Sequence, residues 1–180
     1  GNHNGSLVNG AGWTAASGGI SGRALQLDGI NDQVDIADSS DINSGVHNVR
    51  TVALWFKAGA PGKAAKQVLY EEGGATRGLN IYLESGPLYF GGWNNNENGW
   101  GETFLTTSLN DQNWHHVAFV LDAPGTTNGT FTGYLDGFAI GEDSAAAINS
   151  HTADIGIGAM NDASRFHDGT AGGDAHWFEG

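Results

Sequence analysis

The stretch Asn113-Trp114-His115-His116-Val117-Ala118-Phe119-Val120-Leu121-Asp122 indicates the fold of this chain more strongly than any other part of it. In an extended strand its side chains divide into two sets, one on each face: Trp114, His116, Ala118 and Val120, and His115, Val117, Phe119 and Leu121. Both sets are largely apolar, which is typical of a strand covered on both sides within a β-sandwich. We therefore expect an all-β protein with this strand deep in its interior.

His115 and His116 are the obvious candidates for chemistry in this strand. Adjacent side chains of a strand point to opposite faces, so the two rings cannot chelate one metal together or act as an acid–base pair on one substrate. We interpret both as structural side chains, each hydrogen-bonded near a strand end and packed against its neighbours.

Further strands are predicted at roughly ten-residue spacing, with glycine-bearing turns between them. They cover residues 24–28, 33–36, 51–57, 67–71, 79–83, 88–90, 103–108, 130–135 and 154–158. Asp28-Gly29 is a strong turn dipeptide, so residues 24–36 are expected to form a hairpin. The pattern predicts a two-sheet antiparallel β-sandwich or jelly roll.

Composition and charge limit the partners of the chain. Its 180 residues are enough for one large domain over residues 1–180, and 20 acidic against 7 basic side chains give a formal net charge of −13. Such a field repels nucleic acid and anionic lipid and attracts divalent cations. No run reaches the ~20 apolar residues of a membrane span, so membrane insertion is not expected.

Four segments occur in an informative order over nearly the whole chain. They are Gly22-Arg23-Ala24-Leu25-Gln26-Leu27-Asp28-Gly29 with Asn31-Asp32, Thr51-Val52 to Trp55-Phe56, Trp114-His115-His116-Val117-Ala118, and Tyr134-Leu135-Asp136-Gly137. Together they resemble laminin-G-like domains, the concanavalin A-like jelly rolls common in bacterial surface and secreted proteins. The resemblance implies an extracellular or cell-surface setting and two sheets of about six or seven strands each.

The resemblance also implies a final strand after Phe178-Glu179-Gly180, lying beside the first strand. The chain contains no such strand, so the sheet is expected to have an open edge. Either the domain continues beyond this sequence, or another chain supplies the strand. Self-association through the open edge is therefore a predicted mode of assembly.

A structural calcium ion is predicted at the turn formed by Asp28, Gly29, Asn31 and Asp32. Calcium takes six to eight oxygen ligands, commonly carboxylates and the carbonyls of tight turns. Resembling domains often hold calcium near this turn with a further C-terminal Asp, which would lie beyond Gly180 here. The alternative is that Asp28 and Asp32 only cap their own backbone.

The segment between Trp93 and Trp100 is the predicted ligand-binding loop. Tryptophan faces stack on the apolar faces of sugars, while amides and carboxylates pair with hydroxyls. The predicted ligand-binding residues are Trp93, Asn94, Asn96, Glu97 and Trp100, with Tyr82 and Tyr89 on neighbouring strands. The alternative is that one tryptophan belongs to the core and the asparagine run is only a turn.

No pair of carboxylates has the spacing that a glycosidase of the resembling fold would use, so no catalytic residue is predicted. We expect a non-catalytic extracellular binding or adhesion module whose partner is a glycan or a surface protein. The first alternative is a structural subunit of a surface layer or filament, with its sheet completed by a neighbouring chain. A glycosidase is the weaker alternative.

Overall fold

The computed structural model describes residues 3–172 and 175–180, and its regular elements are all β-strands. The strands are β1 (Ser6–Val8), β2 (Gly12–Trp13), β3 (Leu25–Gln26), β4 (Gln33–Ile36), β5 (Val49–Lys57), β6 (Gln67–Gly73), β7 (Gly78–Leu83), β8 (Pro87–Glu97), β9 (Trp100–Ser108), β10 (Trp114–Asp122), β11 (Gly129–Leu135), β12 (Phe138–Ala145) and β13 (Ile155–Ile157). This confirms the predicted all-β class.

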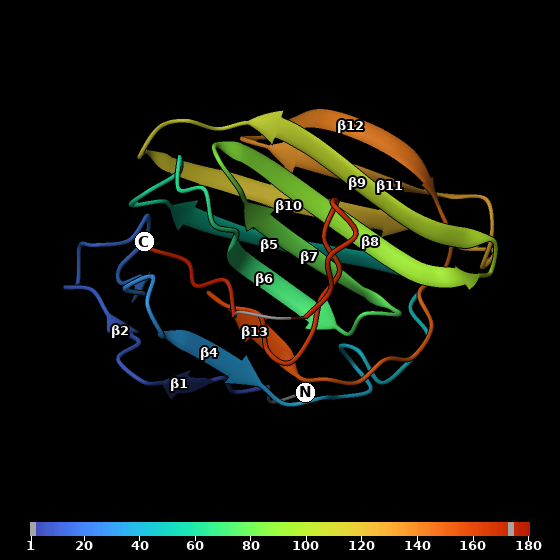
Figure 1. Cartoon of the computed structure of the whole chain (residues 1–180), viewed down its shortest axis with the longest axis horizontal. Coiled ribbons are helices and arrows are strands. Elements are labelled where there is room, and N and C mark those ends of the chain that lie inside the picture. The colour runs from blue at the N-terminus through green and yellow to red at the C-terminus, as the bar shows by residue number, and fades with distance from the viewer. Residues whose placement is uncertain (1–2, 173–174) are drawn as a thin grey trace.

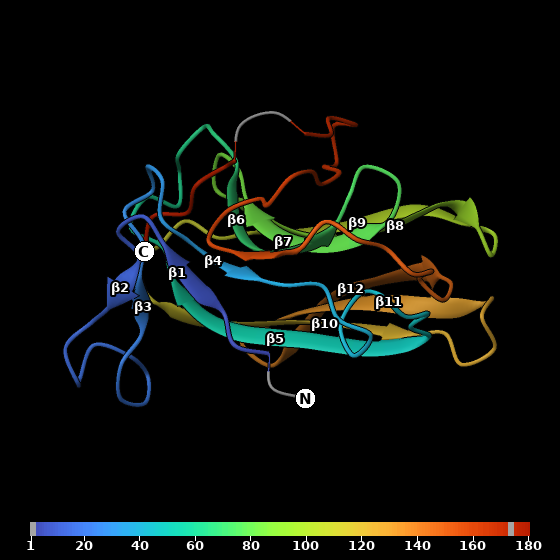
Figure 2. The same cartoon turned by 90° about the horizontal axis from the view of Figure 1, so that it is seen from below.

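The strands form two stacked antiparallel sheets (Figures 1 and 2). The larger sheet has the order β1-β4-β13-β6-β7-β8-β9, and the smaller has the order β12-β11-β10-β5. The predicted two-sheet antiparallel β-sandwich is thus confirmed. The expected second sheet of six or seven strands is corrected to four, because β2 and β3 pair only with each other and leave β5 at the sheet edge.

The predicted hairpin over residues 24–36 is wrong. β3 pairs with β2, whereas β4 pairs with β1 and β13 in the larger sheet. The turn at Asp28-Gly29, where Gly29 has a φ of 72°, redirects the chain from one sheet to the other. A turn dipeptide shows where the chain reverses but not which strand becomes its partner.

β10 lies between β5 and β11, as expected for an interior strand of the sheet. Val117, Phe119 and Leu121 are fully buried between the sheets. The opposite face is the outer surface of the smaller sheet, where His116 packs on Trp55 with ring centroids 5.1 Å apart. Burial on both faces was therefore predicted wrongly, because the outer face is only partly covered by its own neighbours.

The core is built from the inward faces of the two sheets. Its largest fully buried side chains include Phe90 and Ile81 from one sheet and Phe119 and Phe131 from the other. Burial of each such side chain contributes about 1.5–3 kcal/mol. A buried ion pair crosses between the sheets: Arg50 of β5 pairs with Glu72 of β6, which also accepts a hydrogen bond from the Tyr70 hydroxyl.

Residues 158–172, the cover segment, cross the outer face of β6–β8 in both views (Figures 1 and 2). Asn80 of β7 donates hydrogen bonds to the Ser164 hydroxyl at 3.0 Å and the Arg165 carbonyl at 2.8 Å. Lys66 pairs with Asp168 at 2.8 Å. These contacts fix the cover segment to the sheet, and the tip of the β8–β9 hairpin projects beyond it (Figure 1).

Candidate functional site

The predicted loop between Trp93 and Trp100 is the tip of the β8–β9 hairpin, and both indoles are buried. Trp93 is 1% exposed and donates from Nε1 to the Gly74 carbonyl at 2.8 Å. Trp100 packs against Phe131 in the core and lies over Gly92. A Cβ added at Gly92 would be only 2.7 Å from the indole ring. Neither ring offers an open stacking face, which corrects the expectation of a tryptophan-bracketed binding loop.

Asn94 and Glu97, both predicted to contact ligand, are used inside the protein. The Asn94 side-chain nitrogen donates to the Ala147 carbonyl at 3.1 Å, and its side-chain oxygen accepts from the Asn149 backbone nitrogen at 3.1 Å. Glu97 binds Arg77 through two hydrogen bonds, and the Arg77 guanidinium lowers the pKa of Glu97. These side chains hold the hairpin to residues 147–149, and their polar atoms already have partners.

Tyr82 and Tyr89 form a second aromatic group, at the covered part of the face. Their rings stack 4.9 Å apart, and the His167 ring stacks on Tyr89 at 4.2 Å. The Tyr82 hydroxyl lies 2.7 Å from His167 Nδ1. The cover segment therefore takes the stacking faces that were predicted for sugar, and the structure separates these tyrosines from the hairpin tip.

A polar hollow of about 250 Å³, which we call the hairpin pocket, lies beside the hairpin tip. It is lined by Thr76, Trp93, Asn95, Asn96, Gly101, Glu102 and Arg165. Only Trp93 and Asn96 of these residues were predicted. Arg165 reaches the pocket from the cover segment and pairs with Glu102 of β9 across 63 residues of sequence, a contact that no local pattern indicates.

Asn95 and Asn96 line the hairpin pocket from the tip of the hairpin. Both are exposed, and both have left-handed backbones with φ of 51° and 61°. Asparagine tolerates this conformation better than most residues, and strained positions of this kind cluster at ligand sites. Two amides beside a guanidinium–carboxylate pair offer donors and acceptors at close spacing, as a hydroxyl-rich ligand requires.

The predicted calcium turn uses its oxygens internally. Asp28 Oδ1 accepts from the backbone nitrogens of Ile30 and Asn31 at 2.8 and 3.2 Å, and these bonds lower the pKa of Asp28. Asp32 accepts from the backbone nitrogens of Gly10 at 2.7 Å and Asp28 at 3.1 Å.

A positive charge beside the turn also argues against a cation there. The Lys63 ammonium lies 3.2 Å from the Gly29 carbonyl, where a calcium ligand was expected, and the Asn31 carbonyl accepts from Asn9. In residues 3–172 and 175–180, no three His, Asp or Glu side chains are grouped to hold a metal ion. As arranged, the turn does not fit a calcium site, and calcium binding stays a prediction from the sequence.

Glu71 is the most perturbed acid on the outer face. It is fully buried on β6, and burial raises its pKa to about 10, although its Oε1 accepts from the Asn161 backbone nitrogen at 2.8 Å. With this pKa the carboxyl group is neutral at pH 7, and its side chain is not exposed to solvent. It does not make the pair of accessible carboxyl groups that glycoside hydrolysis needs.

Comparison with known proteins agrees with this architecture. The family model described as "Concanavalin A-like lectin/glucanases superfamily" matches residues 28–171. No curated protein matches the chain. Across the described ranges, no helix is long and apolar enough to cross a membrane.

Solved structures with the same fold include binding domains of botulinum neurotoxins. The receptor binding domain of botulinum neurotoxin D is 10% identical, with a TM-score of 0.67 over 87% of this chain and 39% of that chain. The serotype D ligand binding domain in complex with N-acetylneuraminic acid is 11% identical, with a TM-score of 0.68 over 87% and 38% of the two chains. The present chain thus spans about two-fifths of the length of these toxin chains.

Proposed function

Because the chain belongs to the concanavalin A-like lectin/glucanases superfamily, we propose that it is a non-catalytic module that binds carbohydrate in the hairpin pocket. One observation carries the proposal: the exposed Asn95 and Asn96 amides border a hollow of about 250 Å³ together with Glu102 and Arg165. Sugar hydroxyls both donate and accept hydrogen bonds, so neighbouring amide and carboxylate groups suit them.

The ligand class that fits best is a neutral sugar. The Arg165 guanidinium is already paired with Glu102, and the whole chain carries a net charge of −13, which repels acidic sugars. Related support comes from two toxin structures, one in complex with N-acetylneuraminic acid and one in complex with SialylT. Those ligands belong to the toxin domains, and the charge of the present chain favours a different sugar.

The setting we propose is extracellular or at the cell surface, as in the laminin-G-like proteins that the sequence resembles. A surface protein is the alternative ligand for the same pocket. The proposal needs no metal ion at the pocket, and calcium at the Asp28 turn is a separate question.

A glycan array with point variants tests the proposal. Asn95→Gly and Asn96→Gly remove each amide while glycine accepts the left-handed backbone, so folding should be preserved. We expect each variant to lose about tenfold or more in affinity for a bound glycan. Ser85→Gly is the matched control, since Ser85 has a φ of 56° on an exposed turn away from the pocket. Full glycan binding by both asparagine variants would exclude the hairpin pocket.

A second candidate function is that of a structural module whose sheet is completed by a strand from a neighbouring chain. The observation that favours it is the edge position of β5, which pairs with β10 on one side only. In the simplest form of this function, a second copy of the chain supplies the strand, and light scattering tests that form. Stable dimers or longer assemblies of the isolated protein would support completion between copies, and a monomer would count against completion between copies.

A further inference from the structure

The tip of the β8–β9 hairpin contains a β-bulge that borders the hairpin pocket. The register of β8 on β9 breaks between Trp93 and Glu97, where residues 94–96 of β8 lie opposite a single residue of β9. A bulge bends its strand and changes the direction of its side chains, and bulges are frequent next to active sites. Asn95 and Asn96 lie on this bulge and line the pocket, so the shape of the bulge sets the shape of the pocket wall.

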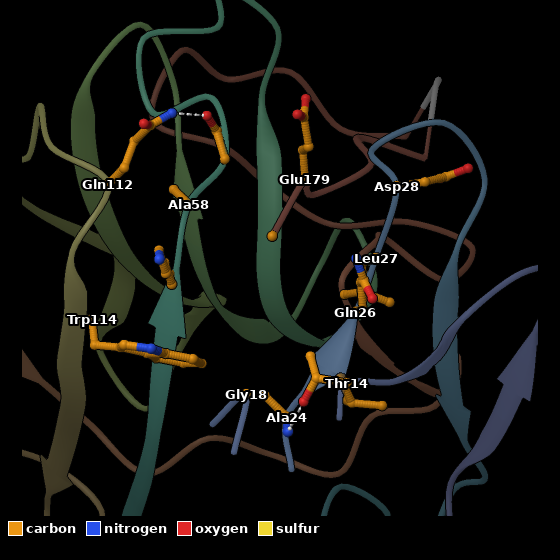
Figure 3. A pocket seen from close by; sticks show the side chains of 14 residues that line it. Thr14, Gly18, Ala24, Gln26, Leu27, Asp28, Ala58, Gln112, Trp114 and Glu179 are labelled. Carbon is orange, nitrogen blue, oxygen red and sulfur yellow. Dashed lines mark hydrogen bonds between the residues drawn. The ribbon is translucent and has the colours of Figure 1, made fainter. Parts of the chain in front are cut away.

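The backbone of the bulge directs the Asn95 and Asn96 side chains. In the described part of the chain neither side chain makes a hydrogen bond, and both residues have a positive φ, 51° and 61°. Figure 3 shows a different arrangement in a hollow of about 460 Å³, where the Gln112 side chain is fixed by donating to the Gly59 carbonyl. Without such a bond, the two asparagine amides keep their direction only as long as the bulge keeps its backbone conformation.

Asn149 bonds to both ends of the bulge. Its backbone nitrogen donates to Asn94 Oδ1 at 3.1 Å, and its side-chain nitrogen donates to a carboxylate oxygen of Glu97. Its side-chain oxygen accepts from Asn98 Nδ2 at 3.1 Å, in the turn that follows the bulge. Asn94 Nδ2 also donates to the Glu97 carbonyl at 3.1 Å. The bulge is therefore closed by one of its own side chains and held at both ends by a residue from another part of the chain.

Residues 147–151, which we call the strap, are anchored on both sides of Asn149. Ile148 is fully buried, and its backbone exchanges two hydrogen bonds with His47, each at 2.9 Å. The His151 nitrogen donates to the carbonyl of a buried residue between β4 and β5 at 2.9 Å. Because the strap is fixed before and after Asn149, this residue presents its hydrogen-bonding groups to the bulge from a fixed position.

We propose that Asn149 is a positioning residue for the hairpin pocket: by holding both ends of the bulge, it keeps the Asn95 and Asn96 amides directed into the pocket. The inference rests on the proposed glycan-binding function, and it gives Asn149 no contact with the ligand. A wall that is ordered before the ligand arrives lowers the entropy cost of binding. The strap therefore raises the affinity of the pocket without adding a contact to the ligand.

Asn149→Asp tests the proposal, because aspartate has nearly the same shape but its side chain cannot donate to Glu97. The variant places two carboxylates side by side and should loosen the bulge. We expect the backbone order parameters of residues 95–98, measured by NMR without ligand, to fall from about 0.85 to about 0.6 or lower. Glycan affinity should fall about tenfold. The matched control is Asn48→Asp, since Asn48 is an exposed residue whose side-chain amide donates to the Pro124 carbonyl.

A double variant distinguishes positioning from a general loss of stability. In Asn149→Asp, Glu97→Gln the glutamine amide can donate to the aspartate carboxylate, and the net charge of the chain is unchanged. We expect order at residues 95–98 and glycan affinity to recover in large part, although the pair of Glu97 with Arg77 is lost. Asn149→Ala, which removes the side-chain bonds without adding charge, should lower both order and affinity.

Three results would overturn the proposal. The first is unchanged order at residues 95–98 in Asn149→Asp and Asn149→Ala. The second is reduced order with unchanged affinity for a glycan that the wild type binds. The third is an equal loss in Asn48→Asp, or no recovery in the double variant. If the wild type binds no glycan, the proposed function fails, and the order parameters alone decide whether Asn149 holds the bulge: reduced order with recovery in the double variant supports that role, and unchanged order excludes it.

Discussion

The Asp136 carboxylate holds His115 from the neighbouring hairpin turn: its Oδ2 lies 2.7 Å from His115 Nδ1, and its Oδ1 accepts from the His116 backbone nitrogen at 2.8 Å. His115 Nε2 lies 2.9 Å from Asp111. Both ring nitrogens thus face oxygens that only accept, so the doubly protonated ring is favoured. Asp136 and Gly137 both have positive φ, 52° and 85°, as a tight hairpin turn requires.

Replacing Asp136 by asparagine is expected to weaken this link by about 1 kcal/mol at pH 6, because the side chain is partly exposed. Partial burial lowers the pKa of His115, but the bonds to Asp136 and Asp111 outweigh it and raise the pKa above 6.5. The stabilisation by His115 is therefore complete below pH 6.5 and is lost as pH rises through the raised pKa. Chemical denaturation at a series of pH values measures the free energy of unfolding, and Asp136→Asn should make its decrease with rising pH smaller. The same decrease in variant and wild type would show that the bond to Asp136 does not raise the pKa of His115.

Glu71→Gln is expected to stabilise the protein at pH 8 and to leave it little changed at pH 4. The folded-state pKa of Glu71 is about 10, against an ordinary 4.5, so the unfolded chain releases its proton first as pH rises. The free energy of unfolding therefore decreases as pH rises from 4.5 to about 10. Glutamine does not titrate, so the variant does not show this decrease. Denaturation midpoints of both proteins at the two pH values measure the effect. A variant less stable at pH 8 would show that Glu71 is ionised.

Arg50→Met is expected to destabilise the protein by about 3 kcal/mol, because Glu72 is fully buried and loses its charged partner. The double variant Arg50→Met, Glu72→Leu should recover part of that loss, since an apolar pair leaves no buried charge. Asp41→Asn, which affects an exposed pair with His3, is the control and should have little effect. Equal losses in the single and double variants would show that the charge of Glu72 is not the cause.

Removal of calcium is expected to leave the melting temperature unchanged, because Asp28 and Asp32 already accept backbone hydrogen bonds. A bound ion stabilises a folded protein by mass action, so scans with chelator and with millimolar calcium measure its presence directly. Magnesium is the matched control for ionic strength. A calcium-specific rise in melting temperature would restore the site predicted from the sequence.

Much of the fold follows from local sequence pattern. Alternation in residues 114–122 correctly predicts β10, and it correctly sends His115 and His116 to opposite faces, where they contact Phe56 and Trp55. Alternation depends only on the geometry of an extended chain. It does not say which sheet covers a face, which is why the exposed side of β10 was predicted to be buried.

The candidate site could be predicted only in part. The asparagine run indicates the hairpin that borders the candidate pocket, but its polar composition suggested a loop, whereas Asn94 extends β8 by bonding to residues 147–149. Arg165 and Glu102 meet across 63 residues through the path of the cover segment. Partners brought together by tertiary structure leave no periodic trace in the sequence.

For the proposed sugar site, the cover segment limits the shape of ligand that can reach this face. Asn80, Lys66 and Tyr82 fasten it across β6–β8, so a long polysaccharide has no open channel along those strands. The hairpin pocket beside the tip of the β8–β9 hairpin stays open. We therefore expect the protein to recognise the terminal residue of a glycan, with the remainder of the glycan projecting into solvent, so that branch ends rather than backbone repeats would determine which surfaces it recognises.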